Sequence, residues 1–69
     1  MTPEALRRFR EKQGLTQAQM ADLLDYTRSY YNEIENGAKP LSYRTGLLIE
    51  GMRMSPAFCE RVLHGAGFR

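Results

Sequence analysis

Hydroxyl side chains and glycines recur along this chain at intervals that divide it into short helical segments. The first segment opens on Thr2-Pro3-Glu4, a hydroxyl followed by proline and an acid, which is typical of a helix start. Leu6 and Phe9 stand three residues apart and therefore share one helical face. Gly14 ends the segment, because glycine readily adopts the left-handed conformation that follows a helix.

The centre of the chain repeats this pattern. Thr16 and Gln19 match a capping box, in which a hydroxyl and an amide satisfy the first free N–H groups of a helix. The pattern predicts a second helix over about Gln17 to Leu24, with Met20 and Ala21 on its apolar side.

A third helix follows after a very short turn. Asp25 and Tyr26 form this turn, since aspartate tolerates unusual backbone angles. Thr27 then caps a helix from Arg28 to Asn36, and Gly37 ends it.

Two further helices complete the chain. The fourth is expected from residue 41 or 42 through about Met52, and Ser55-Pro56 begins a fifth that runs to about His64 and ends at Gly65. No segment shows the strict alternation of a half-buried strand. The sequence therefore predicts an all-α bundle of five helices.

Composition limits the function without deciding it. At 69 residues the chain is expected to be one domain, residues 1–69, with a core that dimerisation would usefully enlarge. The single cysteine, Cys59, cannot pair within the chain, which favours a reducing compartment. Neither an apolar run of membrane length nor a signal-peptide pattern is present, so we expect a cytoplasmic protein. A net charge of +2 permits a nucleic-acid partner.

The second and third predicted helices have the layout of a helix-turn-helix over residues 16–37. In that motif the second helix enters the major groove of DNA. On a helical wheel, Tyr30, Tyr31 and Ile34 fall on one side of this helix. The opposite side carries polar side chains, namely Arg28, Ser29, Asn32, Glu33 and Asn36. Arginine can bind guanine, asparagine can pair with adenine, and glutamate can accept from cytosine.

Residues 6–49 resemble the Cro/repressor-type helix-turn-helix family of phage and bacterial regulators, also called the XRE family. The stretch from Gly14 to Ala21 resembles the family's entry into helix 2. Ile34-Glu35-Asn36-Gly37, followed by Lys39-Pro40, resembles the exit from its recognition helix. The two stretches lie at the family's usual separation, and the resemblance implies a lambda-repressor-like five-helix fold.

The resemblance also implies a role for individual residues. The side chains expected to read bases are Thr27, Arg28, Ser29, Asn32 and Glu33. Those expected at the DNA backbone are Gln17, Asn36, Lys39 and Arg44, and the residue types add Tyr30 and Tyr43. Arg10 and Glu35 match an ion pair that ties helix 1 to helix 3 in relatives.

The chain departs from the family pattern at three places. Asp25 replaces the usual glycine of the turn, and Tyr31 replaces a branched aliphatic residue. The stretch from Leu41 to Met54 fits the family's fourth helix only loosely.

The apolar residues of the last two helices suit either the protein's own core or a dimer surface. A two-fold dimer would place two reading helices about 34 Å apart, one turn of DNA. We therefore expect a homodimer on an inverted repeat. Its predicted interface consists of Met52, Met54, Phe58, Val62 and Leu63.

The interpretation that follows is a sequence-specific regulator of transcription that binds double-stranded DNA. A repressor that occludes a promoter is the simplest form. The alternative is a protein-interaction module on the same fold, such as an antitoxin-like or phage adaptor protein. No constellation of residues suggests an enzyme, a metal site, a cofactor or a small-molecule effector, so we expect none.

Overall fold

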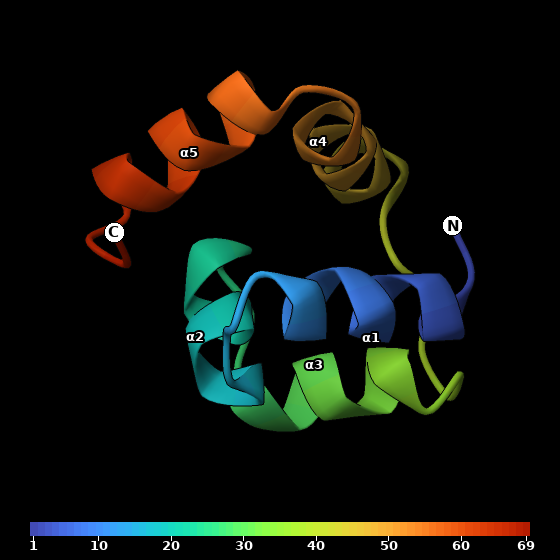
Figure 1. Ribbon diagram of the computed structural model, residues 1–69. Coiled ribbons are helices and arrows are strands. Elements are labelled where there is room, and N and C mark those ends of the chain that lie inside the picture. Colours follow the sequence, from blue (N-terminus) through green and yellow to red (C-terminus); the bar gives the residue numbers. More distant parts are fainter.

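The computed structural model describes residues 1–69 and contains five helices and no strands (Figure 1). In chain order these helices are α1 (Pro3–Lys12), α2 (Gln17–Leu23), α3 (Arg28–Glu35), α4 (Tyr43–Met54) and α5 (Pro56–Gly65). The predicted all-α class is confirmed.

Each helix begins directly after a hydroxyl side chain that caps it. In all five, the hydroxyl oxygen accepts a hydrogen bond from the backbone N–H three residues further on. These cap residues are Thr2, Thr16, Thr27, Ser42 and Ser55. The Gln19 side chain also accepts from the Thr16 N–H at 2.9 Å, which completes the expected capping box.

Four of the helices end in the same way, with a residue in the left-handed conformation. Gly14, Gly37 and Gly67 occupy this position after α1, α3 and α5, and Asp25 occupies it after α2 with φ of 62°. In each case the next residue's N–H bonds to a carbonyl five residues back, as in a Schellman motif. α5 runs one residue further than predicted, since Gly65 is its last residue and Gly67 takes the left-handed position.

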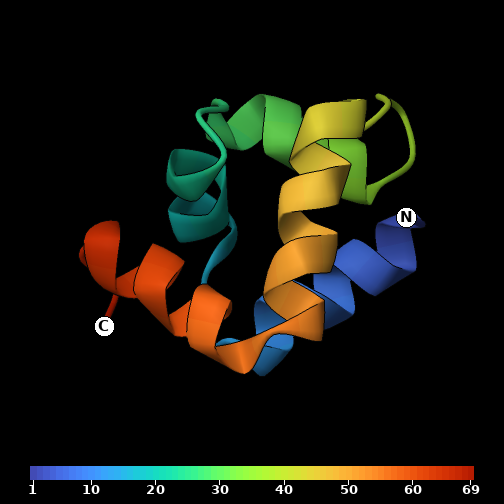
Figure 2. The ribbon, with the colours of Figure 1, turned by 90° about the horizontal axis from the view of Figure 1, so that it is seen from above.

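The core fills the space between two layers. In Figure 1, α4 and α5 form the upper layer, α1 and α3 lie below them, and α2 stands at one end. Viewed from above, α4 crosses over the lower layer and α5 turns away from its end (Figure 2). The core is made by side chains from every helix and from the α1–α2 loop: Leu6, Phe9, Leu15, Met20, Ala21, Leu24, Tyr31, Ile34, Ile49, Met52, Cys59 and Leu63.

Two residues of the predicted dimer interface belong to this core. Met52 and Leu63 are 1% and 0% exposed, so their side chains offer no surface to a partner. Val62 is partly buried and packs against the core, whereas Met54 and Phe58 are exposed. For Met52 the prediction was wrong because the apolar residues of α4 occupy more than one face of the helix, so that periodicity does not identify the inward face.

No helix of the protein combines the length and the apolar character needed to cross a membrane.

Candidate DNA-binding surface

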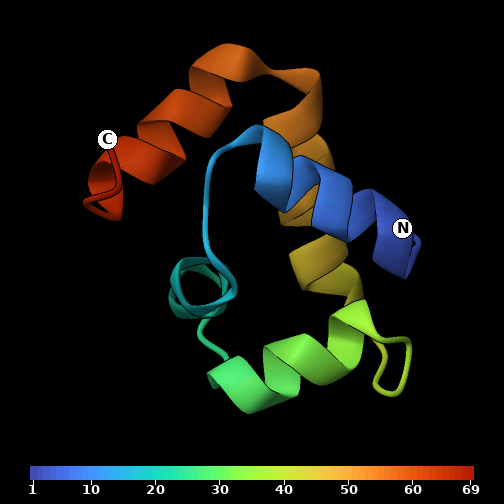
Figure 3. The same ribbon diagram turned by 60° about the horizontal axis from the view of Figure 1, so that its bottom comes forward.

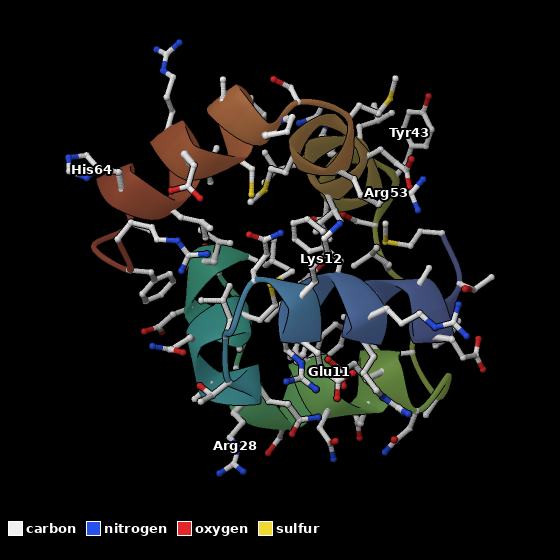
Figure 4. All side chains as sticks on the ribbon, in the orientation of Figure 1. Glu11, Lys12, Arg28, Tyr43, Arg53 and His64 are labelled. Carbon is white, nitrogen blue, oxygen red and sulfur yellow. The ribbon has the colours of Figure 1, made fainter.

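Helix α3 has one buried face and one exposed polar face. Tyr31, Ile34 and Glu35 are buried against the rest of the protein. In Figure 4, Arg28 projects from the lower edge of the molecule, away from the other helices. The exposed side chains of α3 and its caps are Thr27, Arg28, Ser29, Asn32, Glu33 and Asn36.

The buried face is fixed to α1 by an ion pair between Arg10 and Glu35. The Arg10 Nε lies 2.7 Å from one carboxylate oxygen of Glu35, and its Nη2 donates to the other at 3.2 Å. Arg10 also donates to the Leu15 carbonyl at 3.1 Å. A two-pronged contact of this kind fixes orientation as well as distance, so the pair expected from the sequence is present and sets how α3 lies against α1.

The surroundings of Glu35 hold it in the charged form. Burial alone would raise the pKa of its carboxyl, but hydrogen bonds from Arg10 and Gln17 outweigh burial and leave the pKa below its ordinary value. The hydrogen bond to Glu35 likewise raises the pKa of Arg10. Both side chains therefore stay ionised at neutral pH.

Gln17 at the start of α2 connects the ion pair to the exposed face of α3. Its side-chain Nε2 donates to Glu35 Oε1 and to Asn32 Oδ1, both at 3.1 Å. This contact orients the Asn32 amide, whose two N–H donors and second oxygen lone pair remain free for another partner. The network was not predicted from the sequence, which assigned Gln17 only to the DNA backbone.

Thr27 holds the first turn of α3 in place. Its hydroxyl oxygen accepts from the Tyr30 N–H at 3.1 Å, and the O–H stays free to donate. The N–H groups of Arg28 and Ser29 have no partner within the helix, because they belong to its first turn. Such an N-terminus favours a phosphate.

Residues 4–68 of the chain match the sequence model of a protein family that is described as a helix-turn-helix domain. The chain belongs to this helix-turn-helix domain family. The resemblance expected from the sequence is thereby confirmed, and so is the lambda-repressor-like helical fold.

One relative of this helix-turn-helix domain is the HTH-type transcriptional regulator PrpR of Mycobacterium tuberculosis. The two are 43% identical over 44 residues, which cover 64% of this chain and 9% of the relative. The chain thus spans only a small part of the length of that relative. No solved structure matches the chain.

The turn between α2 and α3 of this helix-turn-helix domain is supported by two tyrosines. The rings of Tyr26 and Tyr30 are 5.2 Å apart and tilted by 36°. The Tyr26 hydroxyl lies 3.4 Å from Thr45 Oγ1, and this hydrogen bond lowers the pKa of Tyr26. Tyr30 is half-buried at the edge of the exposed face.

The remaining residues assigned to the DNA backbone lie in two places. Asn36 caps the end of α3 and Lys39 lies exposed in the following loop. Figure 3 shows this loop connecting the end of α3 to α4, whose first turn contains Arg44. In Figure 1 that turn belongs to the upper layer, whereas α3 forms the lower edge. Tyr43 projects from the side of α4 away from α5, while Arg28 points from the opposite edge of the molecule (Figure 4). The structure does not bring Tyr43 to the exposed face of α3.

Tyr31 fills the core at a position where the family has a smaller side chain. It is completely buried, and its hydroxyl has no hydrogen-bond partner. Burial raises the pKa of this phenol far above its ordinary value, and the nearby Glu35 carboxylate raises it further. Tyr31 therefore supports α3 from behind as a neutral side chain.

Proposed function

We propose that this helix-turn-helix domain, residues 1–69 with its core motif at 16–37, binds double-stranded DNA in a sequence-specific manner and regulates transcription. The observation that carries the proposal is the exposed polar face of α3, backed by Tyr31, Ile34 and the Arg10–Glu35 pair. A rigid helix with a free polar face is the element that enters the major groove in this type of motif.

Each base-reading side chain has a partner that its chemistry prefers. Arg28 can donate two hydrogen bonds to O6 and N7 of guanine, and Asn32 can pair with N6 and N7 of adenine. The Gln17 contact supports the second assignment, because it fixes the amide before DNA arrives. Glu33 can accept from the amino group of cytosine. Thr27 and Ser29 flank these side chains at the start of α3.

The DNA backbone is bound around this face. The N-terminal ends of α2 and α3 supply N–H groups to phosphates. Tyr30, Asn36, Lys39 and Arg44 add side-chain donors. Gln17 contributes its backbone N–H, because both of its side-chain N–H groups bind Asn32 and Glu35. Such contacts fix the register of the helix on DNA without reading the sequence.

The domain acts as a repressor, as a homodimer on an inverted repeat, in the cytoplasm and without catalysis. The eight-residue α3 reaches only a few base pairs, and a two-fold dimer doubles the sequence read. The relationship to a transcriptional regulator supports a role at promoters. Occlusion of the promoter needs no further domain.

Selection of binding sites from random DNA by the purified protein tests the proposal. We expect a palindromic consensus, bound far more tightly than unrelated DNA and more weakly as salt increases. A selection that enriches no sequence, or equal affinity for the consensus and a scrambled duplex, would contradict it.

A protein-interaction module is the second candidate, and one observation favours it. Tyr43, Leu47 and Met54 expose apolar side chains on α4, away from the face of α3. A partner protein that co-purifies with the domain and is lost from variants of these residues would support this function.

A further inference from the structure

One face of α4 exposes apolar side chains that no other part of the protein covers. Tyr43, Leu47, Glu50 and Met54 follow one another at intervals of four, three and four residues, so they form a stripe along the helix. Tyr43 is 79% exposed, Leu47 54% and Met54 80%. The opposite face of α4 is formed by the core residues Ile49 and Met52. We call the four-residue set the α4 stripe.

The two ends of the α4 stripe differ in shape. Near its start lies a groove of about 750 Å³ between the first turn of α1, the α3–α4 loop and α4. The stripe residues Tyr43, Leu47 and Glu50 form one wall of this groove, and Leu41 lies in it. At the other end Met54 protrudes into solvent. The same helix therefore carries a hollow and a side chain suited to fill it.

The charges beside the stripe are also self-complementary. Glu50 and Arg53 form an exposed ion pair at 3.3 Å within α4. When two copies of a helix pack side by side and antiparallel about a two-fold axis, residues on one edge of the first copy lie beside residues on the same edge of the second copy, in reversed order. Glu50 of one copy then meets Arg53 of the second, and the reverse contact follows by symmetry.

We infer that a second copy of this chain packs antiparallel along the α4 stripe, with Met54 of each copy entering the groove beside Leu47 of the other. Glu50 and Arg53 exchange partners across the two-fold axis. The inference deepens the proposed homodimer and rests on it. In this dimer the interface consists of exposed residues of the α4 stripe and does not use Met52 and Leu63, which are buried.

This arrangement agrees with the position of α3. In Figure 1, α4 is seen end-on and α3 lies along the lower edge. In the same orientation Tyr43 and Arg53 project from the side of α4 away from α5 (Figure 4). A vertical two-fold axis on that side reverses the direction of α4 and keeps both α3 helices at the lower edge. Both reading faces then point the same way, as an inverted repeat requires.

Sedimentation equilibrium of the purified protein without DNA, at concentrations up to about 1 mM, tests the inference. The wild type should form dimers. Glu50→Arg places two arginines together at each symmetric contact, so we expect the dimer dissociation constant to rise about tenfold or more. The double variant Glu50→Arg with Arg53→Glu restores opposite charges and should recover the wild-type constant to within about threefold.

A matched pair elsewhere provides the control. Glu60 and Arg69 form an exposed ion pair at 3.5 Å that lies outside the stripe, so Glu60→Arg should leave dimerisation unchanged. Leu47→Asp should weaken the dimer about tenfold or more, since it places a charge at the apolar contact. Circular dichroism will show that each variant keeps its helices.

Three outcomes overturn the inference: a wild type that stays monomeric, a charge exchange that fails to restore dimerisation, or a Glu60→Arg effect as large as that of Glu50→Arg. The affinity of the same proteins for a single half-site separates the inference from the proposed function, because Glu50 and Arg53 lie outside the residues assigned to DNA. A monomeric protein that binds half-sites specifically contradicts only the dimer.

Discussion

Glu35 is the residue in which burial and charge oppose each other most directly. It lies in the core yet carries a negative charge, which Arg10 and Gln17 compensate by hydrogen bonds. A buried pair of this kind contributes little net stability, but breaking it is costly because one charge is left without a partner. Its role is to hold α3 at a fixed angle and, through Gln17, to orient Asn32.

Replacement of Glu35 by glutamine should therefore destabilise the protein by about 2 kcal/mol or more. The folded pKa of Glu35 lies below its ordinary value of 4.5. The stability that depends on its charge is thus fully present above that value and is lost as the pH falls through the folded pKa. The free energy of unfolding of the wild type, measured with urea, should fall over this acidic range, while that of Glu35→Gln should depend less on pH. Equal pH dependence in both proteins would contradict the assignment.

At the scale of the element, the turn between α2 and α3 decides how the two helices meet. Asp25 adopts φ of 62°, and the Tyr26 N–H bonds to the Ala21 carbonyl at 2.8 Å. These are the features of a Schellman motif. Aspartate is among the few residues besides glycine that enter this conformation at modest cost, so the turn keeps its usual geometry despite the change of residue.

Asp25→Ala should lower the free energy of unfolding by about 1 kcal/mol, because the left-handed conformation is less favourable for alanine than for aspartate. Asp25→Asn and Asp25→Gly should change it by less than about 0.5 kcal/mol. Urea unfolding of the three variants measures this order. An alanine variant as stable as the other two would show that the turn is not fixed in this conformation.

The helices themselves could be predicted because their signals are local. A cap hydroxyl and the N–H that it binds lie three residues apart, so Thr16, Thr27 and Ser55 could be recognised directly in the sequence. The contacts of Gln17 could not, since they join residues 15 and 18 positions away and depend on how α2 and α3 pack. The family resemblance supplied the Arg10–Glu35 pair in advance, which spacing alone did not indicate.

At the scale of the whole molecule, α4 and α5 close the core from above and carry the least predictable surfaces. The chain measures 31 × 20 × 19 Å, so most of its short helices must bury one face in the core. In α4, apolar residues occupy more than one face, and only the packing of the helix against the rest of the protein decides that Met52 is inside and Met54 outside.

This difference between two nearby methionines predicts opposite results. Met52→Ala removes a core side chain and should destabilise the protein by about 2–5 kcal/mol. Met54→Ala should change the stability of the monomer by less than about 0.5 kcal/mol, because its side chain is exposed. Thermal or urea unfolding at low protein concentration compares the two. Similar losses in both variants would mean that α4 is rotated from the position described.

The central claim is that the exposed face of α3 reads base pairs, and Arg28→Ala tests it most directly. Binding of the wild type, Arg28→Ala and the control Arg61→Ala to every single-base variant of the selected site should be compared at one salt concentration. Arg28→Ala should lose about 1–3 kcal/mol of discrimination at one position of each half-site and keep the others, while Arg61→Ala, on α5, keeps the full profile. Uniform weakening of Arg28→Ala on all sequences would contradict the claim.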